Sequence, residues 1–295
     1  MRSSGFFALL LLISPTPLLA AEGRVNTAPG IEIHYREAGP ADATHQLLLI
    51  PGWRISSSIW AGQMAYFSSH GYRVVAIDSR SQGGSTVVPQ GNAPEDRAAD
   101  IDAVIRSLKL KQVLLVGWSQ GAQDVAAYVG RFGTAALLGV VLVDSPVSAG
   151  PDDVTLNPGF IKVISGGMGV YARHPAEYTD GMMHAIISTP APAQTFTDLD
   201  TAAALTPVDV GVSMLVQDMF AVDRRPDLQK FDKPTLVIAS GQSPLLQNQR
   251  DMAKALPHGQ FVAVDHAAHA VFFDQPERFE ALLEDFVTKL DAAGD

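Results

Sequence analysis

The pentapeptide GWSQG, at Gly117–Gly121, lies between two segments of opposite character. The run before it, QVLLV, is short, apolar and β-branched, which is typical of a buried strand. The run after it, AQDVAAYVGRF, has apolar residues at helical spacing. A G-x-S-x-G sequence between a strand and a helix predicts a sharp turn that holds the serine hydroxyl clear of the strand end. Gly117 and Gly121 are small because neighbouring backbone passes close to such a turn, and Ser119 is the candidate nucleophile.

Strand-like and helix-like segments alternate along most of the chain. The strand candidates are short and mostly apolar: Ile31–Glu37, Gln46–Ile50, Arg73–Ile77, Gln112–Val116, Leu138–Val143, Pro234–Ala239 and Phe261–Val264. The helix-like segments between them are Ser58–His70, Pro94–Leu108, Ala122–Phe132, Asn248–Leu256 and Pro276–Leu290. Alternation at these lengths predicts an α/β fold with right-handed crossovers and a mostly parallel sheet covered by helices on both faces. Ligands of such folds bind beyond the carboxyl ends of the strands, and Ser119 lies at one such end.

The alternation stops between Pro146 and about Arg225, where the sequence is rich in Pro, Gly and Ala and contains no convincing strand. We expect residues 147–225 to form a helical cap inserted after the sixth strand, and residues 22–146 and 226–295 to form the core. Because methionine fills irregular apolar space, those of this stretch favour either the roof of an apolar pocket or the packing of the cap on itself. They are Met168, Met182, Met183, Met214 and Met219.

The first 21 residues are expected to lie outside the fold. Arg2 gives them a positive start, Phe6–Ile13 is a short apolar run, and Leu19–Ala21 ends on small residues, as in a secretory signal peptide. The apolar run is too short for a membrane span, so we expect no stable membrane insertion. These features predict a periplasmic or secreted protein, with a retained N-terminal anchor as the alternative.

Composition excludes several classes of function. The formal net charge is −10, from 21 Lys and Arg against 31 Asp and Glu, and the basic residues form no cluster. Binding to nucleic acid or to an anionic membrane surface is therefore not expected. The chain has no cysteine, which rules out disulfides, thiol chemistry and Cys metal sites. We expect neither a metal nor a cofactor.

A serine nucleophile needs a base, and His269 is the best placed of the eight histidines. It follows the strand candidate Phe261–Val264 and precedes the last helix, which puts it on a loop at the same end of the sheet as Ser119. Imidazole titrates near neutrality, so that it can take the serine proton and return it to a leaving group. His266, three residues earlier, is the rival candidate.

These motifs together resemble the α/β-hydrolase superfamily over nearly all of the chain that follows the leader, except the variable cap. LLLIPGW at Leu47–Trp53 resembles the strand and turn that supply an oxyanion hole, with Pro51 where the family has His. DSRSQGGST at Asp78–Thr86 resembles the family's D-x-R-G-x-G-x-S turn, with Ser81 where Gly is usual. HAVFFDQPERF at His269–Phe279 resembles the family's ending. The resemblance implies an eight-stranded, mostly parallel sheet, but it leaves the reaction open because the fold hosts many chemistries.

Acyl transfer also needs two backbone N–H groups directed at the oxyanion of its tetrahedral intermediate. One is expected from Gln120, which follows Ser119 at the start of a helix and lacks an intrahelical acceptor. The other is expected from Trp53, directly after the Pro51–Gly52 turn. We also expect the indole of Trp53 to line the acyl pocket.

The acid that orients His269 is displaced from its usual place in the family. That place follows the first strand candidate after the cap, where SGQSPLL puts Ser243, and an alcohol cannot balance an imidazolium. Asp144, at the end of the preceding strand in VLVDSP, is the alternative. Haloalkane dehalogenases and cofactor-free ring-cleaving dioxygenases of this superfamily carry their acid there, although an Asp here can also simply cap a turn. Asp265 and Asp274 are rivals in sequence but lie too close to His269 along the chain.

The segments PGW, GYRVVAIDSR, GWSQG and AYVGRFGT resemble most the non-haem chloroperoxidase and aryl-esterase branch, whose members are esterases with a perhydrolase side activity. We therefore expect a serine hydrolase that cleaves a small carboxylic ester or lactone through an acyl-enzyme. One alternative is a cofactor-free oxygenase in which His269 and Asp144 act as a dyad and the serine positions the substrate. Another is a non-catalytic binding protein. Dehalogenase chemistry is excluded, because its nucleophile is a carboxylate and residue 119 is Ser119.

Overall fold

The computed structural model describes residues 21–148, 158–220 and 222–294. The predicted leader lies outside the described residues except for Ala21, which is the first residue of the first strand. That strand is not among the sequence candidates, because only Val25 of AEGRVNTA is buried and no apolar alternation marks it. It pairs with the next strand in antiparallel register, with Ala21 opposite Glu37.

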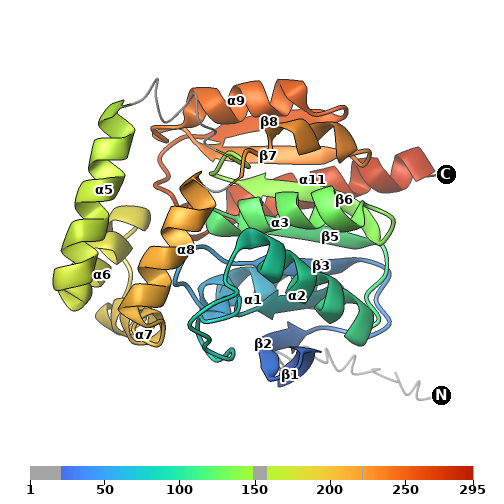
Figure 1. Ribbon diagram of the computed structural model, residues 1–295. Coiled ribbons are helices and arrows are strands. Elements are labelled where there is room, and N and C mark those ends of the chain that lie inside the picture. The colour runs from blue at the N-terminus through green and yellow to red at the C-terminus, as the bar shows by residue number, and fades with distance from the viewer. Residues whose placement is uncertain (1–20, 149–157, 221, 295) are drawn as a thin grey trace, which may run out of the picture.

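An eight-stranded sheet forms the centre of the molecule (Figure 1). Its strands are β1 (Ala21–Ala28), β2 (Ile31–Ala38), β3 (Gln46–Ile50), β4 (Arg73–Ile77), β5 (Val113–Trp118), β6 (Leu137–Val143), β7 (Thr235–Ser240) and β8 (Gly259–Val264). Their order across the sheet is β1-β2-β4-β3-β5-β6-β7-β8. The two pairs that include β2 are antiparallel and every other pair is parallel, which confirms the mostly parallel sheet that the sequence predicts.

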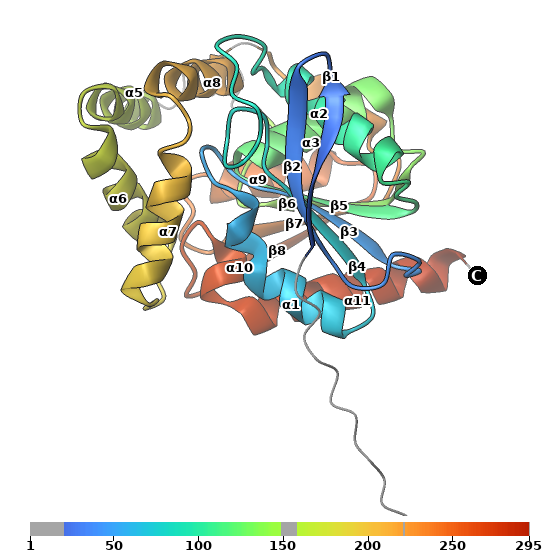
Figure 2. The same ribbon diagram turned by 90° about the horizontal axis from the view of Figure 1, so that it is seen from below.

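Helices cover both faces of the sheet (Figure 2). One face packs against α1 (Ala61–Ser69) and α11 (Pro276–Gly294), together with the short η1 (Ser57–Trp60) and α10 (Val271–Asp274). The other face packs against α2 (Pro94–Ser107), α3 (Gln120–Phe132) and α9 (Leu246–Ala255), with η2 (Arg225–Lys230) beside them. Each predicted helix of the core is therefore present, with ends that differ by a few residues.

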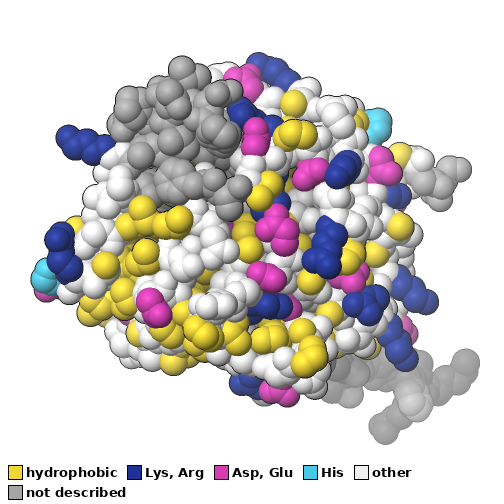
Figure 3. Space-filling view, viewed as in Figure 1, with side chains coloured by type: hydrophobic (Ala, Val, Ile, Leu, Met, Phe, Trp, Pro, Cys, Tyr) yellow, Lys and Arg dark blue, Asp and Glu magenta, His cyan; other side chains and the backbone are white. Residues whose placement is uncertain are grey.

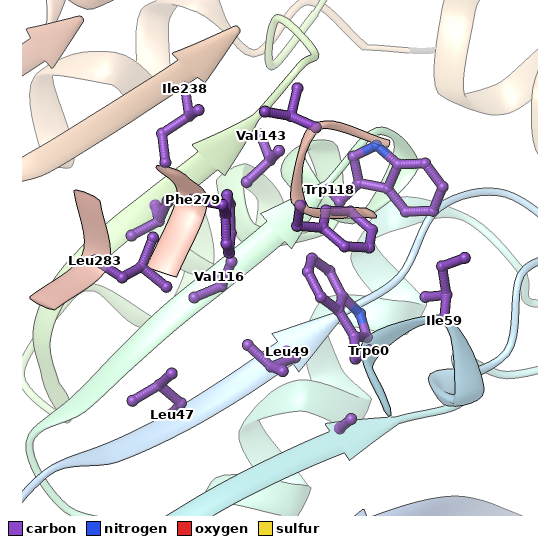
Figure 4. Packing of buried hydrophobic residues seen from close by; sticks show 14 of the residues in the cluster. Leu47, Leu49, Ile59, Trp60, Val116, Trp118, Val143, Ile238, Phe279 and Leu283 are labelled. Carbon is purple, nitrogen blue, oxygen red and sulfur yellow. The ribbon is translucent and has the colours of Figure 1, made fainter. Parts of the chain in front are cut away.

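The strand β3, QLLLI, illustrates how the sheet builds two hydrophobic cores. Its residues are all buried, and successive side chains of a strand point to opposite faces. Leu47 and Leu49 accordingly pack with Phe279 in one cluster (Figure 4), whereas Leu48 and Ile50 belong to the cluster on the opposite face. Burial on both faces explains why this strand is a continuous apolar run instead of an alternating one. Each such side chain contributes about 1.5–3 kcal/mol of transfer free energy.

In the described part of the chain between β6 and β7, four α-helices form a layer at one side of the sheet (Figure 1). They are α5 (Pro158–Arg173), α6 (Pro175–Ile186), α7 (Ala193–Ala203) and α8 (Val208–Phe220), and we call them the cap. Hydrophobic side chains gather on the outside of this layer, whereas charged ones are spread over the core (Figure 3). Among the methionines, Met183 is fully buried in the main core cluster, and Met214 packs with Trp53. Met183 and Met214 therefore pack the cap against the rest of the molecule.

No single helix in the described parts of the chain has both the length and the hydropathy of a membrane span. The helices α7 and α8 taken together, bent by 87° at their junction, meet these criteria by length and composition alone.

Candidate active site

The turn that follows β5 places Ser119 in a strained conformation. Its φ is 56° and its ψ is −120°, a region that residues with a Cβ rarely adopt. A Cβ on Gly117 would lie 2.4 Å from the carbonyl oxygen of Gly121, and one on Gly121 would lie 2.5 Å from that of Ile50. Both glycines are therefore needed for the strand and the helix to meet at this angle. The serine stands between the last residue of β5 and the first of α3, as the pentapeptide predicts.

The structure brings Ser119, His269 and Asp144 together in one hydrogen-bonded chain. The Oγ of Ser119 lies 2.8 Å from Nε2 of His269, and Nδ1 of His269 lies 2.8 Å from Oδ2 of Asp144. A proton on Nδ1 that is donated to the carboxylate leaves Nε2 free to accept the serine proton. The loop that carries His269 is fixed by the indole of Trp118, which donates to the His269 carbonyl at 2.9 Å. The neighbouring Ala270 N–H donates to Ile186 of the cap at 2.8 Å.

Asp144 is buried, and both oxygens of its carboxylate have hydrogen-bond partners. While Oδ2 faces His269, Oδ1 accepts the backbone N–H of Ser240 and the side-chain amide of Gln249, both at 3.0 Å. A buried carboxylate is costly without such partners, and three donors satisfy this one. Its backbone φ of 44° is a second strained position at the carboxyl ends of the strands. Asp144 therefore does more than cap a turn, since one of its oxygens faces the imidazole.

The position that usually holds the acid carries Ser243, and Gln249 connects it to Asp144. The amide nitrogen of Gln249 lies 3.0 Å from Oγ of Ser243 and also 3.0 Å from Oδ1 of Asp144. Sequence reasoning missed Gln249 and the Ser240 N–H as supports of the acid. The signal for Gln249 was a polar residue on the buried face of a helix, but that pattern does not reveal its partner.

The rivals in the sequence have other places in the structure. The carboxylate of Asp274 accepts the backbone N–H groups of Ser188, Thr189 and Ala268, and so ties the cap to the loop before His269. Burial raises the pKa of Asp274, but these hydrogen bonds outweigh it and leave the pKa below its ordinary value.

Among the histidines, His266 is exposed and its carbonyl accepts from Gln275 at 2.9 Å. The hydrogen bond to the Ser119 hydroxyl comes from His269 instead. The exposed Asp265 lies with its Oδ1 beside Gly241, after β7.

Two backbone amides beside Ser119 are free to bind an oxyanion. A Cβ on Gly52 would lie 3.1 Å from the Cβ of Ser119, which shows how closely the turn before Trp53 approaches the serine. Within the described chain, neither the Trp53 nor the Gln120 N–H donates to another backbone group. Gln120 begins α3, so its N–H has no acceptor within the helix. Unpaired N–H groups at this point fit the two donors that acyl transfer requires.

The indole of Trp53 is placed differently from the expectation. Only 9% of the residue is exposed, and its Nε1 donates to the Gly211 carbonyl of α8 at 2.9 Å. Its ring packs edge-on against Tyr171 and contacts Val210 and Met214. The side chain is therefore part of the contact between the cap and the core, because a buried indole N–H needs an acceptor and the cap supplies it.

A buried ionic cluster lies behind Gln120. The side-chain amide of Gln120 donates through its nitrogen to Asp218 of α8 and accepts through its oxygen from Gln82 at 3.1 Å. Asp218 shares Arg97 with Asp124, at 2.5 Å and 2.8 Å respectively. The pKa of Asp124 is raised to about 7. Burial raises it most, Arg97 lowers it, and Asp218 raises it further. Sequence reasoning missed this cluster, although its charged residues fall on the buried faces of predicted helices.

No group of three or more His, Cys, Asp or Glu side chains that could hold a metal ion occurs among the residues with described positions. The Ser119 hydroxyl faces an imidazole that is itself hydrogen-bonded to a carboxylate, and the backbone N–H groups of Trp53 and Gln120 lie nearby. This set suits proton transfer and stabilisation of an oxyanion.

The model of the alpha/beta hydrolase family matches residues 47–282, and the chain belongs to this family. It is 27% identical over 274 residues to a non-heme chloroperoxidase of Kitasatospora aureofaciens, covering 89% of this chain and 98% of that one. It is 37% identical over 123 residues to a bifunctional esterase/perhydrolase of Acinetobacter calcoaceticus, covering 42% of this chain and 44% of that protein. A solved esterase structure from Exiguobacterium antarcticum superposes with a TM-score of 0.80 at 19% identity, covering 90% and 98% of the chains.

Proposed function

We propose that the protein is a serine hydrolase that cleaves a small carboxylic ester or lactone through an acyl-enzyme. The observation that carries this proposal is the continuous chain from the Ser119 hydroxyl through His269 to Asp144, with 2.8 Å at each step. The name of the relative from Acinetobacter calcoaceticus, an esterase/perhydrolase, supports the same reaction class.

The proposed reaction starts with attack of the Ser119 Oγ on the substrate carbonyl. His269 takes the serine proton at Nε2, and the resulting imidazolium is stabilised by Asp144 at Nδ1. The amides of Trp53 and Gln120 bind the oxyanion. His269 then gives its proton to the leaving alkoxide, and the acyl group stays on Ser119. Water, deprotonated by the same imidazole, attacks the ester carbon of the acyl-enzyme. The bond to the Ser119 oxygen then breaks, His269 returns the proton to that oxygen, and the acid is released.

A perhydrolase side activity follows from the same intermediate. Hydrogen peroxide in place of water attacks the acyl-enzyme and releases a peracid, while its proton goes to His269. The chloroperoxidase and perhydrolase names of the relatives favour this second activity. The activity requires Ser119, and an oxygenase that uses only His269 and Asp144 would not.

We also propose that residues 1–21 direct export to the periplasm or beyond, on the composition of the segment. The intact mass of protein recovered from the periplasm of a bacterial host tests this. A mature chain that begins within a residue or two of Glu22 supports export, and a chain that keeps Arg2 argues for a retained anchor.

Steady-state hydrolysis of p-nitrophenyl esters from acetate to octanoate tests the proposed reaction. Ser119→Ala should lower kcat by about 10³-fold or more, as loss of a nucleophile does. Ser69→Ala, which removes an exposed hydroxyl in α1, is the matched control and should keep the full rate. Hydrolysis that persists at the full rate in Ser119→Ala contradicts the acyl-enzyme.

A further inference from the structure

The buried arginines of the described chain form ion pairs with carboxylates, with one exception. Five arginines in the described chain are buried, and an ionised group is costly to bury unless it is paired. Four of them form ion pairs: Arg73 with Glu37, Arg80 with Asp100, Arg97 with Asp124 and Asp218, and Arg224 with Glu95. The fifth is Arg54, the residue that follows Trp53.

Arg54 has unused hydrogen-bonding capacity as well as an unbalanced charge. It is 2% exposed, and its Nη2 donates to Oγ1 of Thr179 at 2.9 Å and to the Ala203 carbonyl at 3.1 Å. Its Nε and Nη1 have no partner, and no carboxylate oxygen in the described chain lies within 4.0 Å of the guanidinium. The guanidinium lies over the ring of Tyr171 at 4.2 Å and near that of Trp53 at 5.2 Å. Aromatic rings stabilise a cation partly, but they do not neutralise it.

The guanidinium borders a cavity of about 560 Å³ between the loop after β3 and the cap helices. The wall is partly apolar and includes Val208 and Ala204, and Tyr171 lies in it with a fully buried hydroxyl that has no partner. The cavity therefore combines apolar surface with four buried polar atoms that have no partner: Nε and Nη1 of Arg54, the Tyr171 hydroxyl and Oδ1 of Asp200. Because these nitrogens are buried, a ligand can reach them only if neighbouring side chains move.

The charges around this cavity limit the kind of anion that it suits. Glu177, Asp180 and Asp200 also line the cavity, and none of them pairs with Arg54. Burial raises the pKa of Asp200 and the neighbouring Asp180 raises it further, whereas His184 and Arg54 lower it, and the net shift is upward. These acids would repel a ligand with two negative charges. A single carboxylate directed at Arg54 would instead contact the only Lys or Arg side chain among the described residues that line the cavity.

We propose that this cavity binds the carboxylate of a small monoanionic ligand with an apolar body, and that Arg54 is its counter-ion. Hydrogen bonds to a charged group are the strong ones, and a carboxylate supplies the acceptor oxygens that Nε, Nη1 and the Tyr171 hydroxyl lack. The site does not depend on the chemistry at Ser119. The same carboxylate could belong to the substrate or to a separate ligand, because Arg54 directly follows Trp53.

Calorimetric titration with benzoate and benzamide tests the proposal, because the two probes have nearly the same shape and differ in charge. Benzoate should bind at least tenfold more tightly than benzamide. Arg54→Met should weaken benzoate binding at least tenfold and leave benzamide unchanged. The exposed Arg131 provides the matched control, and Arg131→Met should bind both probes as the unaltered protein does. Circular dichroism checks that each variant is folded.

If Arg54→Met does not fold, Tyr171→Phe provides a second test, because it removes only the unpartnered hydroxyl. It should weaken benzoate binding about threefold or more. Equal binding of the two probes, or benzoate binding that survives in every folded variant of Arg54 and Tyr171, overturns the site. Repeating the titration in Ser119→Ala separates this proposal from the proposed hydrolysis.

The source of the carboxylate is decided by ester hydrolysis in the presence of benzoate. Competitive inhibition of p-nitrophenyl acetate hydrolysis, absent with Arg54→Met, identifies the site as the part of the substrate pocket that holds a substrate carboxylate. Binding of benzoate without inhibition identifies a separate ligand. Inhibition that is equal in Arg54→Met places benzoate elsewhere and overturns the assignment to Arg54.

Discussion

At the scale of single residues, Asp144 shows that the acid can follow a different strand from the one that usually carries it in the family and still make the same contact with the imidazole. The strands β6 and β7 are parallel neighbours, so their carboxyl ends lie side by side. An acid after either strand can therefore approach the same edge of His269. In this chain it follows β6, and β7 contributes the Ser240 N–H that holds the second oxygen.

Asp144→Asn tests this role. The amide nearly keeps the shape of the carboxylate, but it favours the wrong tautomer of His269 and cannot stabilise an imidazolium. Ester hydrolysis should therefore lose about 10³–10⁴-fold in kcat with little change in thermal stability. Ser243→Asp alone should change little, and in the Asp144→Asn background it should restore part of the rate. Full activity of Asp144→Asn would show that another group orients the histidine.

The sequence predicts the residues that the hydrogen-bonded chain contains, but not those that support it. Ser119 and His269 have local signatures, namely a strand–turn–helix pentapeptide and a loop before the final helix. The signal for Gln249, a polar residue on the buried face of a helix, does not reveal its partner, because that partner depends on α9 lying beside the end of β6. The role of the Trp53 indole was not predictable for the same reason, since its acceptor lies in a cap with no fixed pattern.

His34 gives the protein a pH-dependent contribution to stability that can be measured. Its Nδ1 lies 2.9 Å from Asp78, and this hydrogen bond raises the pKa of His34 above 6.5. The folded state thus binds the proton more tightly than the unfolded state. The pair stabilises the fold fully below pH 6.5, and this contribution is lost as the pH rises through the folded pKa. His34→Gln should therefore lower Tm more at pH 6 than at pH 9, and an equal loss at both would contradict the pairing.

At the scale of elements, the predicted strands and helices of the core agree with the structure because most of them have a buried apolar pattern. The strand β5 extends to Trp118, two residues beyond its candidate, since the indole continues the apolar run into the turn. The helix α3 starts at Gln120, directly after Ser119. The strand β1 lacks such a pattern, because it is an edge strand that depends on pairing with β2 and not on burial.

The cap methionines differ in burial, and this difference predicts their effects. Met183 is fully buried in the main core cluster, whereas Met168 is only half-buried. Met183→Ala should destabilise the protein by about 2–5 kcal/mol, as core truncations do, and it should lower activity equally on all esters. Met168→Ala should cost much less. Urea unfolding measures both, and a Met183→Ala variant of unchanged stability that prefers longer acyl chains would instead mark this residue as part of the pocket.

At the scale of the whole molecule, contacts from several cap helices join the cap to the core beside the candidate site. Trp53 donates to α8, Asp274 accepts from Ser188 in the segment between α6 and α7, and Asp218 of α8 reaches Arg97 and Gln120. Because these contacts join different parts of the cap to the core, the cap and the core should unfold together in a single transition.

Arg97→Met tests that cooperativity, because it leaves Asp124 and Asp218 buried without their cation. Breaking a buried ion pair in this way costs about 3–5 kcal/mol. The denaturant midpoint should fall accordingly, with cap and core probes still coincident. Arg106→Met, which breaks an exposed pair with Asp102, should cost less than about 1 kcal/mol. Separate transitions for the two parts would show that the cap is an independent unit.

The central claim is that Ser119 is an activated nucleophile. Labelling of the folded protein with a fluorophosphonate, followed by peptide mass mapping, tests it most directly. We expect one adduct, on Ser119, that forms much more slowly in His269→Ala and Asp144→Asn and at the normal rate in Ser69→Ala. A folded protein that gains no adduct on Ser119 would contradict the acyl-enzyme and leave the serine as a group that positions substrate.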